Sequence, residues 1–123
     1  MTLENEKRYL LLLASYDCVS KGRIPSKNDV LDCIETNKWA ILSEKDLEYK
    51  HNRHELVWRN DFAFVRKHLA QNGLFQSEIR NDWSITPAGK QELYSLYREA
   101  CSTSLEKIAP AAILYAEDLV PFL

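Results

Sequence analysis

The sequence contains few of the residues that interrupt regular structure, with 3 glycines and 4 prolines in 123 residues. This scarcity argues against a loop-rich or fibrous protein. The apolar runs extend over only a few residues, which is too short for a transmembrane helix, so we expect no membrane contact. Glu4 and Glu6 precede the first apolar run. Because acidic residues are the wrong flank for a secretory signal, we expect a cytoplasmic protein.

Motifs that would support catalysis or metal binding are also lacking. The cysteines, Cys18, Cys33 and Cys101, form no C-x-x-C pair, so we expect each thiol to pack as a small apolar group. The histidines complete no metal set with them. The sequence has no Gly-rich phosphate loop, no nucleophile motif and no converging carboxylates with a lysine. We therefore expect no metal, no cofactor and no enzyme activity in this chain, and a nuclease domain would lie outside it.

Charge is distributed unevenly along a chain of otherwise ordinary composition. Hydrophobic residues make up 46% and charged residues 28%, with a net charge of −2, and the length fits one globular domain. Residues 49–81 carry six Lys and Arg against three Asp and Glu, a local net charge of +3, and also all three histidines. Such a segment is what a phosphate-contacting surface would need, although a solvated face with no function has the same composition.

The first half of the chain carries clear signals for helix starts. The apolar pattern predicts a buried helix over residues 3–19, with Thr2 as its N-cap. Ser26 with Asp29 is the start signature of a second helix. The same signature predicts a short helical turn over residues 43–48, and a polar loop is expected to follow it.

A third helix is predicted over residues 57–72, where Gly73 provides the stop. At 100° per residue, four apolar side chains fall within about 60° of one another on this helix. They form its expected buried stripe: Trp58, Phe62, Val65 and Leu69.

The second half of the chain predicts a hairpin, a helix and an amphipathic tail. Apolar residues alternate on both sides of an Asn-Asp turn within residues 74–86, which is typical of a β-hairpin. Thr86-Pro87 then begins a fourth helix. Apolar residues recur at steps of three and four in the tail, residues 105–123, where Pro110 is expected to start or kink a helix.

This order of elements is typical of a winged helix-turn-helix domain, in which one helix enters the DNA major groove and a hairpin wing touches the backbone or the minor groove. We therefore predict a mainly α fold with a small β-hairpin, in the α+β class. Residues 1–101 would form the winged-helix DNA-binding domain. Residues 102–123 would form a helical extension, or a linker to a further domain or a dimer partner.

The passage from residue 58 to residue 89 resembles one known family. The residues that carry the likeness are Trp58-Arg59-Asn60-Asp61-Phe62-Ala63-Phe64-Val65-Arg66-Lys67-His68-Leu69, Asn72-Gly73-Leu74 and Trp83-Ser84-Ile85-Thr86-Pro87-Ala88-Gly89. They are similar to the N-terminal domain of Mrr-type restriction endonucleases, and the likeness extends over roughly residues 5–97. Phe64 stands where that family more often has Trp, and residues 105–123 match nothing in it. The resemblance implies double-stranded DNA, with methylated DNA among the candidates, as the partner of a recognition module for a modification-dependent nuclease.

The face of the third helix opposite Phe62 is the candidate for base contacts. It is expected to present Asn60, Phe64, Lys67 and Gln71. Asn and Gln can bind adenine through two hydrogen bonds, Lys suits guanine or phosphate, and an aromatic ring can touch the methyl group of thymine or of a modified base. The alternative is an ordinary polar surface with Phe64 packed against another helix.

Other basic and polar residues are candidates for backbone contacts. Arg59 and Arg66 flank the buried stripe of the third helix, as phosphate contacts or as salt-bridge partners. In the loop before this helix, Lys50, Arg53 and His54 are predicted to contact phosphates. Arg80 and Asn81 are predicted to lie at the tip of the wing.

Two functions remain open at this stage. The first is sequence- or modification-dependent DNA binding that delivers a nuclease domain. The second is a winged-helix domain for protein interaction, or a general transcriptional regulator, in which residues 105–123 form a homodimer or an interdomain seam.

Overall fold

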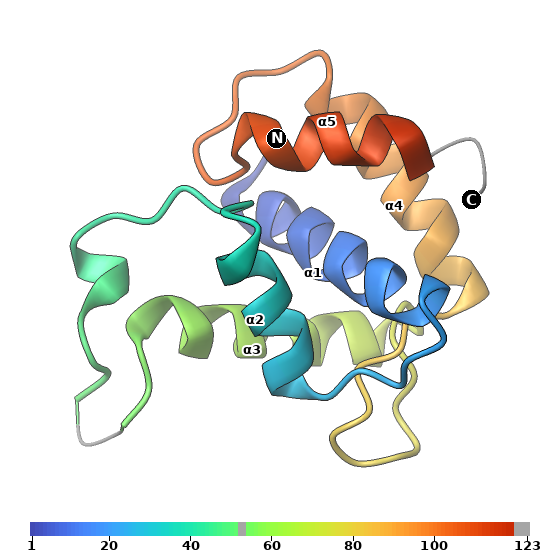
Figure 1. Ribbon diagram of the computed structural model, residues 1–123, viewed down its shortest axis with the longest axis horizontal. Coiled ribbons are helices and arrows are strands. Elements are labelled where there is room, and N and C mark those ends of the chain that lie inside the picture. Colours follow the sequence, from blue (N-terminus) through green and yellow to red (C-terminus); the bar gives the residue numbers. More distant parts are fainter. Residues whose placement is uncertain (52–53, 120–123) are drawn as a thin grey trace.

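The computed structural model describes residues 1–51 and 54–119 (Figure 1). All of its regular elements are helical. They are α1 (Leu3–Ser20), α2 (Lys27–Thr36), the short 3-10 helix η1 (Lys45–Leu47), α3 (Val57–Gln71), α4 (Pro87–Ala100) and α5 (Pro110–Leu119). The helices predicted over residues 3–19 and 57–72 are confirmed to within one residue at each end, and the predicted starts of α2 and α4 are confirmed as well. η1 lies within the turn predicted over residues 43–48, whereas α5 covers only part of the stretch predicted over residues 105–123.

α1 is the central element of the fold, and α2, α3 and α4 all pack against it (Figure 1). Every residue from Tyr9 to Cys18 is buried, including the polar side chains of Ser15 and Asp17. A helix that is buried on all sides must be surrounded by other elements. In Figure 1, α5 lies above α1, and α2 and α3 lie below it.

The predicted helix starts are made by side-chain caps. Thr2 Oγ1 accepts from Asn5 N at 3.1 Å, and Ser26 with Asp29 forms a reciprocal capping box. At α4, Thr86 accepts from the backbone of the third helical residue, and proline occupies the first helical position. Each cap satisfies a backbone N–H that the helix leaves unpaired.

The predicted β-hairpin wing is wrong, and with it the α+β class: the described part of the chain is all-helical and has no sheet. Residues 74–86 form a loop whose two ends meet at one isolated antiparallel bridge, between Phe75 and Ile85. Two backbone bonds flank this bridge, from Gln76 N to Ser84 O at 2.9 Å and from Thr86 N to Leu74 O at 3.0 Å.

The bridge does not extend because other partners bind the groups that a β-ladder would need. The side chain of Gln76 accepts from the backbone N–H of Ile79 and donates to its carbonyl oxygen. On the returning arm, Trp83 N donates to Pro25 O at 2.8 Å, and Trp83 O accepts from Ser15 Oγ at 2.7 Å. These backbone groups are satisfied without strand pairing.

The beginning of this loop lies directly against α4. A Cβ placed on Gly89 would meet Leu74 O at 2.2 Å and the Ile85 side chain at 2.6 Å. Since no larger residue fits this separation, Gly89 permits the close contact between α4 and the loop.

α5 begins at Pro110, which confirms that this proline starts a helix. Ala112 and Ala116 belong to the same buried cluster as α1, and Tyr9 Oη donates to Ala112 O at 2.8 Å. The segment before α5 is held by the buried carboxylate of Glu6. One oxygen of this carboxylate accepts from three consecutive backbone N–H groups in residues 106–108.

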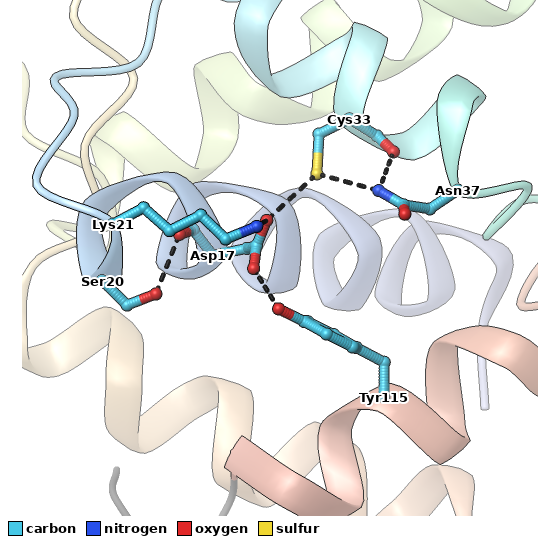
Figure 2. Close-up of polar contacts among 6 residues, drawn as sticks. All are labelled: Asp17, Ser20, Lys21, Cys33, Asn37 and Tyr115. Atoms are coloured by element: carbon cyan, nitrogen blue, oxygen red, sulfur yellow. Dashed lines mark hydrogen bonds and ion pairs between the residues drawn. The ribbon is translucent and has the colours of Figure 1, made fainter.

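A second polar contact fixes α5 to α1. Figure 2 shows the Tyr115 hydroxyl of α5 pointing at the carboxylate of Asp17, to which it donates a hydrogen bond. The other Asp17 oxygen lies 3.1 Å from Lys21 Nζ and 3.7 Å from the thiol of Cys33 (Figure 2). Burial, followed by the bond to Asp17, raises the pKa of Tyr115 above its usual value. The phenol is therefore neutral and keeps its role as donor at physiological pH.

None of the helices in the described ranges is both long enough and apolar enough to cross a membrane.

Candidate nucleic-acid interface

α3 separates its side chains into a buried stripe and an outward face. Its buried residues are Trp58, Phe62, Val65 and Leu69, which confirms the predicted stripe. On the opposite side Phe64, Lys67 and Gln71 are exposed, and Asn60 is half-buried. We call these four residues the α3 outward face.

Phe64 does not pack between helices, because 60% of its surface is exposed. Its ring makes a T-shaped contact with the ring of His68, with centroids 4.9 Å apart and planes at 70°. His68 Nδ1 in turn lies 2.7 Å from Glu4 Oε1, in the first turn of α1. An exposed phenyl ring is thus held from one side by a histidine that α1 contacts.

A shallow hollow beside α3 joins part of the outward face to other elements. It has a volume of about 440 Å³ and contains Lys50, Asn60 and Phe64 of the predicted site residues. Glu4 and Lys7 from α1 also line this hollow. No local sequence pattern points to these two residues, because they meet α3 through the tertiary fold.

Arg59 is engaged by α2 and does not face open solvent. Its guanidinium lies 3.0 Å from Asp32 and 3.5 Å from Glu35, and its side chain is only 15% exposed. Arg59 was predicted to be either a phosphate contact or a salt-bridge partner, and the structure shows it as a salt-bridge partner. Two carboxylates already neutralise this charge, so it is a poor candidate for a phosphate contact.

Arg66 is in a different situation on the same helix. Its guanidinium carbon lies 5.2 Å from the ring centroid of Trp83, and within the described ranges it forms no ion pair. Burial lowers the pKa of Arg66, and the nearby Asp82 opposes this effect. The half-buried guanidinium therefore rests on an aromatic platform with its charge uncompensated by any direct ion pair.

The remaining predicted residues do not all meet at one place. His54 lies in a second hollow of about 330 Å³, with Lys27 and Arg59 among its lining residues. Arg53 lies outside the described residues. Lys50 and His54 come from one loop but line different hollows.

Arg80 and Asn81 are exposed, and neither lines the hollow beside Phe64. Asn81 Oδ1 accepts from Lys27 N at 3.1 Å, which places this turn against the start of α2. Asn81 adopts a left-handed backbone with φ of +58°, a conformation that Asn tolerates better than most residues. The side chain of Asn81 therefore has a structural role, because it connects this turn to the start of α2.

Metal ligands do not cluster in the described part of the chain. Among residues 1–51 and 54–119, no group of three His, Cys, Asp or Glu side chains could hold a metal ion.

The family model described as the Mrr N-terminal domain matches residues 9–95, a range that reaches from α1 into α4. No curated protein and no solved structure matches the chain.

Proposed function

The chain belongs to the Mrr N-terminal domain family, which is associated with restriction endonucleases, and on this premise we propose that it binds double-stranded DNA in a sequence- or modification-dependent way. It would act as the recognition module of a restriction endonuclease, with methylated DNA among its targets, and leave cleavage to residues outside this chain. The α3 outward face is the observation that carries the proposal. Phe64, Lys67 and Gln71 are exposed along one side of one helix, and the half-buried Asn60 lies on the same side.

These side chains suit the edges of bases in the major groove. Asn60 and Gln71 can each make two hydrogen bonds to adenine, and Lys67 can donate to guanine or to a phosphate. The exposed ring of Phe64 can contact a methyl group, whether it belongs to thymine or was added to another base. An α-helix fits the width of the major groove of B-DNA, so α3 can enter with this face forward.

Phosphate contacts would come from the basic groups around α3. Lys7 and Lys50 border the hollow beside Phe64, and Arg66 lies on the opposite flank of the helix. These few cations would contribute only a modest electrostatic part of the affinity for DNA. Because each neutralised phosphate adds about 0.9 to the slope of log affinity against log salt, we expect a shallow salt dependence.

A mobility-shift titration tests the proposal. The parent chain is mixed with a duplex that is unmodified, methylated at adenine or methylated at cytosine, each at two salt concentrations. We expect a shift at low salt that weakens as salt rises and that differs among the three duplexes. A chain that shifts no duplex at low salt does not bind DNA, and equal shifts would reduce the proposal to DNA binding without modification dependence.

A second candidate function, contact with another protein surface, is favoured by one feature of the tail. An apolar hollow of about 500 Å³ lies between α5 and the segment before it, with Ile41, Leu105 and Ile113 in its lining. Leu114, also in the lining, is 62% exposed. A second copy of this chain or a nuclease domain could cover these side chains. Sedimentation velocity of the parent and of Leu114→Ser tests the homodimer, because only a dimer that uses this surface would dissociate in the variant.

A further inference from the structure

The exposed ring of Phe64 belongs to a chain of contacts that starts in a different helix. Glu4 Oε1 lies 2.7 Å from His68 Nδ1, and the rings of His68 and Phe64 form a T-shaped pair. Glu4 and His68 are 64 positions apart in the sequence. The contact between them exists only because α1 and α3 pack together.

This contact is not needed to hold the two helices together. α1 and α3 already share the buried cluster that contains Phe62, Val65 and Leu69. The Glu4 and His68 side chains are 47% and 34% exposed, and ion pairs at such sites contribute little to stability. The role that remains is local: the pair fixes the ring of His68, and the ring of His68 limits where Phe64 can go.

An exposed aromatic side chain needs such support if it is to contribute to specificity. A ring in solvent can exchange between rotamers, and a binding site loses affinity when it must order its own side chains. A T-shaped aromatic contact is favourable and directional. It therefore favours one orientation of Phe64 before any partner arrives.

We propose that His68 and Glu4 are positioning residues for Phe64, so that the first turn of α1 takes part in selecting the base that α3 contacts. This inference rests on the proposed function. Neither positioning residue needs to touch DNA, because each acts through the ring. Glu4 also lines the same hollow as Phe64, so a displaced ring would change the shape of that hollow.

A double-mutant cycle tests the inference. A duplex selected from a randomised pool by the parent chain is compared with a scrambled duplex of the same length, and the ratio of the two affinities is measured. We expect His68→Ala to lower this ratio severalfold while the salt slope stays unchanged. Phe64→Ala should lower it at least as much, and adding His68→Ala to Phe64→Ala should have no further effect.

Two further variants separate positioning from loss of charge. Glu4→Gln keeps a side-chain oxygen that can accept a hydrogen bond from His68, so its ratio of affinities should stay close to that of the parent. Glu4→Ala lacks this oxygen and should lower the ratio as much as His68→Ala does. Arg23→Ala is the matched control. Arg23 lies in the turn before α2, and its substitution breaks an exposed ion pair with Asp29 of that helix. It should leave the ratio at the parent value.

Several outcomes would overturn the inference. An effect of His68→Ala that persists in the Phe64→Ala background, or that lowers both affinities equally, means that His68 does not act through the ring. A parent chain that shifts no duplex refutes the proposed function instead. In that case NMR of the DNA-free chain still tests the contact, since the absence of a nuclear Overhauser effect between the two rings would exclude positioning of Phe64.

Discussion

Arg66 lies on the ring of Trp83, with the guanidinium carbon 5.2 Å from the ring centroid. Trp83 is itself fixed at both backbone atoms, because its N–H donates to Pro25 and its carbonyl accepts from the buried hydroxyl of Ser15. The arginine therefore rests on a platform anchored to α1. Arg59 lies seven residues earlier on nearly the same side of α3, and it is held by carboxylates of α2.

This difference predicts opposite results for two arginine variants. Arg66→Ala should reduce the slope of log affinity against log salt by about 1, the loss of one phosphate contact. Arg59→Ala should leave the slope unchanged and instead lower the thermal midpoint, because Asp32 and Glu35 lose their partner. Arg66→Lys should keep the slope and lose part of the affinity, since a lysine lacks the planar guanidinium that stacks on the indole. A slope that falls in Arg59→Ala and not in Arg66→Ala would reverse the assignment.

The α3 outward face predicts how two further variants differ. Asn60→Ala should cost about 1–3 kcal/mol on a duplex with the preferred base and little on a scrambled duplex, because an amide reads a base edge. Lys67→Ala should weaken both duplexes if its contact is a phosphate. Mobility-shift titrations of both variants measure these effects.

Arg98→Ala is the control for these titrations, since it removes an exposed cation from α4. We expect it to bind as the parent does. If Asn60→Ala and Lys67→Ala also bind as the parent does, the outward face has been assigned to the wrong partner.

The local features of this fold could be read from the sequence, and the long-range ones could not. The caps at Thr2, Ser26 and Thr86 depend on residues within three positions, so their signals are contained in short segments. The α3 stripe was predictable for the same reason, because helical periodicity alone sets it.

The 74–86 loop and the candidate site could not be predicted, because both depend on contacts between residues far apart in the sequence. Alternation of apolar residues within residues 74–86 favoured a hairpin, but Ser15 and Pro25, far away in the sequence, bind the backbone of Trp83. The contact between Glu4 and His68 likewise has no local signal. Arg59 and Arg66 looked equivalent by angle on the helix, and only the packing of α2 and of the 74–86 loop distinguishes them.

Gly89 makes a prediction about stability. In Gly89→Ala the new Cβ would meet the Leu74 carbonyl oxygen at 2.2 Å, and this oxygen is backbone that accepts from Thr86 N. The loop must therefore shift, and we expect a loss of about 1–3 kcal/mol in the free energy of unfolding. Urea denaturation measures it. Ser95→Ala, at an exposed position of the same helix, is the control and should leave the stability unchanged or raise it slightly. An unchanged urea midpoint in Gly89→Ala would show that the loop can move away without loss of stability.

Asp46 predicts how stability depends on pH. Burial raises the pKa of this carboxyl, but hydrogen bonds from Lys107 and Ser43 outweigh it and hold the pKa below its usual value. Lys107 Nζ lies 2.6 Å away, so the pair connects η1 to the segment before α5. A folded-state pKa below that of the unfolded chain means that ionised Asp46 stabilises the fold at neutral pH. This contribution is complete above the unfolded-state pKa of about 3.9 and disappears as the pH falls through the folded-state value.

The Asp46→Asn variant tests this dependence directly. At pH 7 we expect it to lower the free energy of unfolding by about 1 kcal/mol, because the amide keeps one acceptor oxygen and loses the charge. The difference from the parent should begin to narrow as the pH falls below about 4, where Asp46 of the unfolded parent takes up a proton. It should close once the folded carboxyl, whose pKa is lower, becomes neutral as well. Glu44→Gln removes an exposed charge two positions away and should show no such convergence. The opposite result is a loss in the free energy of unfolding of Asp46→Asn that is as large at pH 3 as at pH 7. In that case protonation would not destabilise the parent, and the contribution of Asp46 would come from its hydrogen-bond geometry and not from its charge.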